Sequence, residues 1–146
     1  MIEPADDVAV VRELILEYAA SLGVDLAFQD FEHEVATLDT YYELMLVARI
    51  EGDVAGCIAL RRIDDEVCEM KRLYVRPEFR GKGLGKALAE RVIIEARRIG
   101  YKKLRLDTVE PVMRAAVAMY RQLGFREIPP YRENPIEGAL YMELEL

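Results

Sequence analysis

The sequence predicts a single α+β domain, in which four helices flank a mixed, mostly antiparallel sheet with a parallel pair of strands at its centre. Three observations support this fold class. A chain of 146 residues with 52% hydrophobic content suits one buried core. Three apolar, β-rich runs follow one another between short turns, and a strand–helix–strand pattern follows them. We therefore expect one domain over residues 1–146.

The first predicted elements are two helices. Apolar residues at helical spacing from Val11 to Leu22 indicate a helix that Gly23 ends. A second, shorter helix is indicated by four further residues at such spacing: Phe28, Phe31, Val35 and Leu38.

Three strands follow, over residues 44–50, 54–63 and 67–75. The segments "EGD" and "DDE" between them have turn composition, so we expect an antiparallel meander. Folding the second hairpin about Asp64 and Asp65 sets Cys68 opposite Arg61, roughly 13 Å along the strand from Cys57. That distance excludes a disulfide, and we expect two reduced thiols in the core.

The second half of the chain begins with a crossover connection. A helical stripe from Leu84 to Ile99 ends at Gly100, and strand 103–108 follows, so strands 67–75 and 103–108 are expected to be parallel neighbours. Residues 112–123 predict another helix. The segment 138–146 alternates apolar residues with glutamate, as in a half-solvated strand near the sheet edge. We expect the functional pocket at the carboxyl ends of the parallel pair.

Charge is segregated along the chain. The net charge is −7, yet residues 71–105 contain 12 Lys and Arg against 3 Asp and Glu. This distribution argues against nucleic-acid binding and favours a compact anionic ligand near the basic segment. No apolar stretch approaches the roughly 20 residues of a membrane span, and no signal pattern begins the chain. We therefore expect a cytoplasmic protein that has no membrane partner.

The basic segment contains the motif "RGKGLG" at residues 80–85, between a predicted strand and a predicted helix. The first N–H groups of a helix lack carbonyl partners and favour anions, and glycines let a phosphate approach the backbone closely. The spacing fits neither the Walker A motif nor the dinucleotide-binding G-x-G-x-x-G pattern. We interpret the segment as a phosphate-binding turn, and a plain glycine-rich connection is the alternative.

Residues 73–108, "LYVRPEFRGKGLGKALAERVIIEARRIGYKKLRLDT", resemble the acetyl-CoA-binding core of the GNAT superfamily of N-acetyltransferases. The family pattern R/Q-x-x-G-x-G/A is met by residues 80–85, and "AAVAMYRQLGFREI" at 115–128 looks like the family's later helix and strand. The resemblance implies the GNAT fold and acetyl-CoA as cofactor. Family members usually begin with a full strand, whereas only "MIEP" is available here, so the first strand is short or trimmed.

The resemblance implies that backbone groups hold most of the coenzyme A. The pyrophosphate is expected on the N–H groups of Lys82, Gly83, Leu84, Gly85 and Lys86. Arg80 and Gly81 would shape this turn. The pantetheine arm is expected to pair with the end of the preceding strand, at Leu73, Tyr74 and Val75. Ala116 would add a contact from the later helix, and Met113 replaces an asparagine that contacts pantetheine in many family members.

The resemblance also implies two catalytic side chains. Glu69 is the candidate general base, because family members that use a glutamate place it on this strand, and burial would raise its pKa. A structural glutamate paired with Lys71 or Arg72 is the alternative. Tyr120 is the expected general acid for the leaving thiolate, since it begins the family's "Y-x-x-L-G-F" segment. A tyrosine that only packs in the core is the alternative there. A backbone N–H near residues 73–75 would meet the carbonyl oxygen.

The acceptor is expected opposite the cofactor, against Tyr18, Phe28, Tyr131, Arg132 and Asn134. Arg132 either binds a carboxylate of the acceptor or is a solvated arginine on a turn fixed by prolines.

We expect acetyl transfer to the primary amine of a small, amino-acid-like molecule. A protein or peptide amine, and a non-catalytic acyl-CoA sensor, are the alternatives. His33 has no companion for a metal site, so we expect no metal. By analogy with the family, the last strand is a candidate surface for a homodimer.

Overall fold

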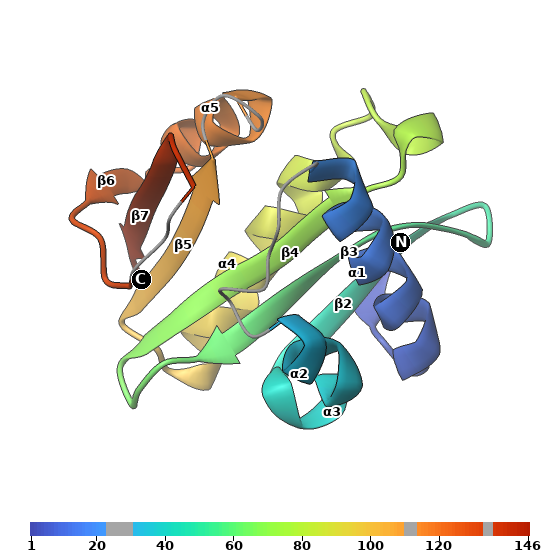
Figure 1. The fold of residues 1–146 in the computed structure, drawn as a ribbon, viewed down its shortest axis with the longest axis horizontal. Coiled ribbons are helices and arrows are strands. Elements are labelled where there is room, and N and C mark those ends of the chain that lie inside the picture. Colours follow the sequence, from blue (N-terminus) through green and yellow to red (C-terminus); the bar gives the residue numbers. More distant parts are fainter. Residues whose placement is uncertain (23–30, 110–113, 133–135) are drawn as a thin grey trace.

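A seven-stranded sheet crosses the molecule in the order β1-β2-β3-β4-β5-β7-β6 (Figure 1). The computed structural model describes residues 1–22, 31–109, 114–132 and 136–146. Among the described strands, β4 and β5 form the one parallel pair, and the other neighbours are antiparallel. The predicted α+β class is confirmed. The strands are β1 (Ile2–Pro4), β2 (Leu44–Ile50), β3 (Asp53–Arg62), β4 (Val67–Val75), β5 (Lys103–Val109), β6 (Arg126–Ile128) and β7 (Ala139–Glu145).

Helices cover both faces of the sheet (Figure 1). One face carries α1 (Val8–Leu22), α2 (Phe31–Ala36) and α3 (Leu38–Tyr41), α4 (Leu84–Ile99) crosses the other, and α5 (Arg114–Gln122) follows β5. The described residues thus hold five α-helices where we predicted four. The second predicted helix is divided at Thr37, which has non-helical backbone and donates its hydroxyl to the His33 carbonyl at 2.7 Å.

The alternation of side chains along β3 divides the core between the two faces. Ile58 and Leu60 pack in the cluster that contains the buried residues of α4, whereas Ala59 packs with residues of α1 and α3. Successive strand residues point to opposite faces, so both faces of β3 need apolar side chains. The run of apolar residues in β3 therefore reflects burial between two helical layers.

The last strand differs from the prediction. β7 is not at the sheet edge, because it pairs with β5 on one side and with β6 on the other. It is also not half-solvated: Glu143, the middle of the predicted polar face, is 5% exposed, since Arg105 and Lys103 pair with it. β7 therefore does not offer the free edge on which we based the possible homodimer.

Both cysteines are buried free thiols, as predicted. The register of the hairpin that joins β3 and β4 is one residue away from the prediction, because Cys68 lies opposite Arg62 rather than Arg61. The turn explains the shift: Ile63 donates its N–H to Val67, so the hairpin folds about Asp65 instead of between Asp64 and Asp65. Burial raises the pKa of both thiols, to about 12.

β4 contains a bulge at Arg72, whose φ is 60°. Lys71 lies opposite Ala59, but Tyr74 lies opposite Cys57, so β4 has one extra residue at this point. The two strands come unusually close just beyond the bulge. A Cβ atom placed on Gly56 would lie 2.4 Å from the Tyr74 carbonyl oxygen. The bulge therefore requires glycine at this position of β3.

The parallel pairing of β4 and β5 is short. It joins residues 67–69 to residues 103–105 and ends there, although both strands continue. Figure 1 shows the two strands diverging toward their carboxyl ends. Leu73, Tyr74 and Val75 therefore have β3 on one side and, among the described residues, no strand on the other.

We expect Gly56→Ala to lower the free energy of unfolding by about 1–3 kcal/mol, because β3 and β4 must separate to admit the methyl group. Urea denaturation measures this loss. Gly85→Ala is the matched control, since a Cβ there would first meet Val75 Cγ2 at an ordinary 3.9 Å. Equal urea midpoints for the two variants would contradict the close approach.

Candidate active site

The turn between β4 and α4 presents backbone N–H groups that have no hydrogen-bond partner among the described residues. Gly81 and Gly83 have φ values of 82° and 76°, and Gly83 is the N-cap of α4. No side chain caps this helix, and its first turn contains no acidic residue. Ala87 is the first residue to donate into the helix, to the Gly83 carbonyl at 3.1 Å. The N–H groups before it therefore point into a turn that suits an anion.

Arg80 fastens this turn to the end of β4. Its Nε donates to the Val75 carbonyl at 2.9 Å, and its guanidinium lies 5.9 Å from the centre of the Tyr74 ring. The side chains of Lys82 and Lys86 are exposed beside it. The chain thus places backbone donors and three cations together, directly after the strand edge at residues 73–75. This arrangement fits the phosphate groups and the extended arm of coenzyme A.

Glu69 lies on β4 with no exposed surface. Its Oε2 accepts a hydrogen bond from the Tyr131 hydroxyl at 2.6 Å and a second one from Arg132. Its Oε1 is also buried and has no hydrogen-bond partner among the described residues. Arg132 extends the cluster to Asp107 of β5, at 3.9 Å. Three of the predicted site residues, Glu69, Tyr131 and Arg132, are therefore brought together.

The surroundings of Glu69 hold its pKa below the ordinary value. Burial alone would raise the pKa, but the charges of Lys71 and Arg132, with the two hydrogen bonds, lower it by more. The expected rise of this pKa is therefore wrong. The alternative, in which Glu69 pairs with Lys71 or Arg72, did not include its direct partners, which are Tyr131 and Arg132. Arg132 is likewise not a solvated arginine, because its guanidinium pairs with Glu69 and its side chain is 25% exposed.

Arg72 makes an ion pair that the sequence did not reveal. Its Nε and Nη2 donate to the two carboxylate oxygens of Glu34 at 2.8 and 2.7 Å, and both side chains are almost fully buried. Tyr42 donates its hydroxyl to the same carboxylate. Glu34 comes from α2, so the pair joins this helix to the bulge of β4. The one sign of this ion pair in the sequence is that Glu34 occupies a position of α2 that faces the core.

Tyr120 is buried on α5, with its ring 5.7 Å from that of Phe125. Burial raises its pKa, and the nearby Tyr18 contributes to the rise. The phenol therefore keeps its proton at every ordinary pH, although its acidity is further from that of a thiol than we expected. Tyr18 lies 6.2 Å from the Tyr74 ring and 5.7 Å from the Arg72 guanidinium. Tyr18 therefore lies near Arg72 and close enough to Tyr120 to affect the pKa of that phenol.

Phe28, Met113 and Asn134 lie outside the described residues, so their predicted roles stay predictions. Ala116 is partly buried on α5 and packs against the core. His33 is exposed on α2, as predicted.

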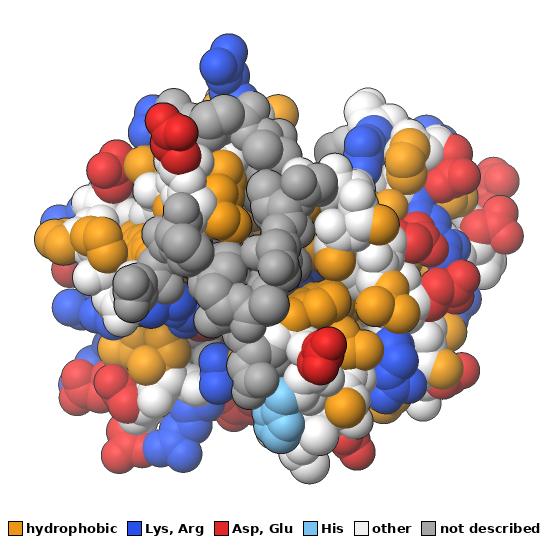
Figure 2. Space-filling model, viewed as in Figure 1, with side chains coloured by type: hydrophobic (Ala, Val, Ile, Leu, Met, Phe, Trp, Pro, Cys, Tyr) orange, Lys and Arg blue, Asp and Glu red, His pale blue; other side chains and the backbone are white. Residues whose placement is uncertain are grey.

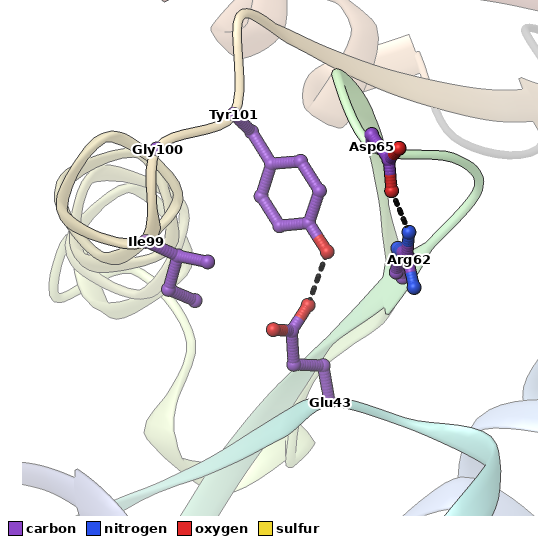
Figure 3. Close-up of a pocket in the computed structure, with 6 residues that line it drawn as sticks. All are labelled: Glu43, Arg62, Asp65, Ile99, Gly100 and Tyr101. Carbon is purple, nitrogen blue, oxygen red and sulfur yellow. Dashed lines mark hydrogen bonds and ion pairs between the residues drawn. The ribbon is translucent and has the colours of Figure 1, made fainter.

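Two cavities lie at opposite ends of the β4–β5 region. The larger, about 920 Å³, is at the carboxyl end of β4, and Tyr74, Arg76 and Phe79 belong to its lining. The smaller, about 290 Å³, is shown in Figure 3, where Tyr101 donates to Glu43 and Arg62 pairs with Asp65. The 16 residues of α4, about 24 Å, separate that pocket from the glycine turn. The larger cavity lies beside β3 and α1 and has no lining residue from β5 or from the glycine turn, so it does not have the position predicted for the functional pocket.

The face that carries α1, α2 and α3 has mixed charge (Figure 2). Basic and acidic side chains are interspersed on it, and basic side chains lie near the single histidine. None of the helices in the described part of the chain is long and apolar enough to cross a membrane.

The geometry agrees with comparison to known proteins. The model of the acetyltransferase (GNAT) family matches residues 9–125. The chain belongs to the GNAT family. An uncharacterized N-acetyltransferase of Schizosaccharomyces pombe is 40% identical over 141 residues, which cover 92% of this acetyltransferase and 86% of the relative. The N-acetylaspartate synthetase of Danio rerio is 34% identical over 140 residues, 92% of this chain and 46% of that protein.

A solved structure similar to this acetyltransferase contains acetyl-CoA. An acetyltransferase of Salmonella typhimurium, solved with acetyl-CoA, has 26% identity and a TM-score of 0.68, over 99% of this chain and 92% of that one. The cofactor is acetyl-CoA, and the protein is an acyltransferase. The glycine turn and the open edge of β4 fit this molecule, which supplies an acetyl group on a thioester.

We expect Glu34→Gln to destabilise the acetyltransferase by about 3–5 kcal/mol near neutral pH, because it leaves the Arg72 charge buried and uncompensated. The dependence on pH has a definite sign. Arg72 and Tyr42 outweigh burial and lower the pKa of Glu34 below its ordinary 4.5. Its contribution is therefore present above that value and is lost as pH falls through the lower folded pKa.

Urea unfolding between pH 3 and 7 tests this expectation. The loss of stability on acidification should be smaller in Glu34→Gln than in the parent protein. The double variant Glu34→Leu/Arg72→Met, which removes both charges, should recover most of the lost stability. If Glu34→Gln has the same free energy of unfolding as the parent protein at pH 7, the Glu34–Arg72 pair does not contribute to stability.

Proposed function

We propose that this enzyme transfers the acetyl group directly from acetyl-CoA to the primary amine of a small, amino-acid-like molecule. The observation that carries the proposal is the buried Glu69 carboxylate with its unpartnered Oε1, on the strand whose next residues form the open cofactor edge. A buried anionic oxygen without a donor costs free energy, and an ammonium group is the natural donor for it. The acceptor nitrogen would thus lie next to the acetyl group.

The electrostatics of Glu69 favour a role in charge stabilisation. A glutamate with a lowered pKa is ionised at neutral pH but is a weaker base than an ordinary one. The bound ammonium must first lose one proton to water, because only the neutral amine has a lone pair that can attack. The attacking nitrogen then becomes positively charged again as it forms its bond to the acetyl carbon. An anion held beside it stabilises that charge. Glu69 can still accept the released proton through its free oxygen, which makes it the general base of the proposal.

Tyr120 is the proposed general acid. Burial keeps its phenol protonated, so it can donate to the sulfur as the carbon–sulfur bond breaks. If Tyr120 only packs in the core, loss of its hydroxyl should leave kcat unchanged. A Tyr→Phe change removes only that hydroxyl, so it separates the two roles.

Arg132 supports an acceptor that carries a carboxylate. Its guanidinium pairs with Glu69 Oε2, so a carboxylate bound by its other N–H groups would lie near an ammonium at Oε1, as the two groups do in an amino acid. The name of the Danio rerio relative, an N-acetylaspartate synthetase, points in the same direction.

The first test is thiol release from acetyl-CoA in a panel of amino acids, polyamines, aminoglycosides and short peptides. We expect turnover with amino acids, and a fall in kcat of about 10²-fold in Tyr120→Phe. Tyr101→Phe is the matched control, because its hydroxyl bonds Glu43 in the remote pocket. Unchanged kcat in Tyr120→Phe would remove it as the acid. Bound acetyl-CoA without thiol release to any amine would instead indicate a sensor.

A second prediction concerns pH. Because the pKa of Glu69 lies below its ordinary value of 4.5, kcat/KM should show no acid limb from this residue between pH 5.5 and 8. Glu69→Gln should lower kcat by about 10²-fold across that whole range. An acid limb near pH 6 to 7 that disappears in Glu69→Gln would show that the carboxyl has a raised pKa.

A further inference from the structure

Arg61 is a basic residue of the acceptor face that the mechanism above does not use. It lies near the end of β3, directly opposite Glu69 in the antiparallel pair with β4. Opposite residues of such a pair point to the same face, with Cβ atoms about 5 Å apart. The Arg61 side chain therefore starts beside the carboxylate proposed to meet the acceptor nitrogen.

The guanidinium of Arg61 is held in place by an aromatic ring. It lies 4.2 Å from the centre of the Tyr41 ring, at the end of α3. Burial raises the pKa of Tyr41, and the charges that act on this phenol include those of Arg61 and Glu69. The ring, the guanidinium and the carboxylate thus share one neighbourhood. Stacking of this kind fixes a guanidinium while leaving its N–H groups available at the edge.

The other strand arginines on this face are already paired with carboxylates of the protein, Arg72 with Glu34 and Arg105 with Glu143. Arg132, which we assign to the first carboxylate of the acceptor, uses Nη2 for Glu69. Arg61 makes no ion pair within 4 Å in the described part of the chain, and its side chain is partly exposed. Its position also excludes the cofactor phosphates as partner. The glycine turn begins after Val75, six residues beyond Glu69, or roughly 20 Å along the strand.

We propose that Arg61 binds a second acidic group of the acceptor, so that the enzyme prefers an amino acid with a carboxylate in its side chain. The amine would lie at Glu69, the first carboxylate at Arg132, and the second at Arg61 on the solvent side of the site. This inference rests on the proposed function, because it assigns the acceptor to the same site. It goes further by naming the residue that binds the acceptor's side chain.

Matched pairs of acceptors test the proposal. We expect kcat/KM for aspartate over asparagine, or glutamate over glutamine, to be at least tenfold in the parent enzyme. Arg61→Gln should reduce that ratio to about one through a higher KM for the acid, with kcat for the amide within twofold. Arg61→Lys, which keeps the charge but loses the planar fork, should give an intermediate ratio.

Arg62→Gln is the control, since this neighbour lies on the opposite face and pairs with Asp65. It should leave the ratio unchanged. A parent enzyme that does not distinguish acid from amide, or a ratio that survives in Arg61→Gln, would overturn the proposal for Arg61 while leaving the transferase intact. Acetyl-CoA binding without acetylation of any member of either pair would count against the amino-acid acceptor and thus against both proposals.

Discussion

The buried ion pair between Arg72 and Glu34 is the interaction on which the architecture of the site depends. Arg72 occupies the left-handed region, which is costly for a residue with a side chain, at the point where β4 gains its extra residue. The two hydrogen bonds to Glu34 hold the side chain, and through it the backbone, in this position. Because Glu34 belongs to α2, the same contact fixes this helix against the face of β4 that carries Glu69.

The bulge and the divergence of β4 and β5 act together. Before the bulge, β4 is an interior strand with neighbours on both sides, at residues 67–69. After it, the strand keeps β3 alone among the described residues and leads, through a short 3-10 helix at Pro77–Phe79, into the glycine turn. One strand thus supplies a buried carboxylate, a free backbone edge and a phosphate-binding turn in sequence. In the proposed function, this order along the chain corresponds to the acceptor amine, the thioester arm and the pyrophosphate.

The sequence predicted the elements better than their contacts. Helix 84–99 and strands 44–50 and 67–75 have the predicted bounds, because apolar periodicity and glycine stops are local signals. The place of β7 inside the sheet was missed, since Glu143, which suggested a solvent-facing position, is neutralised by Arg105 and Lys103 of the neighbouring strand. Pairing across the sheet is non-local, and alternation of residues along one strand cannot reveal it.

The same limit explains the misjudged electrostatics of Glu69. Its position on β4 was visible in the sequence, but Arg132 is 63 residues away in the chain and reaches it only in the fold. Burial without such partners would have favoured a neutral carboxyl. With them, the carboxylate stays ionised inside the protein, where its field is less screened than in water. In our proposal this carboxylate receives a cationic amine, and the cations around Glu69 select the anionic groups that the amine carries.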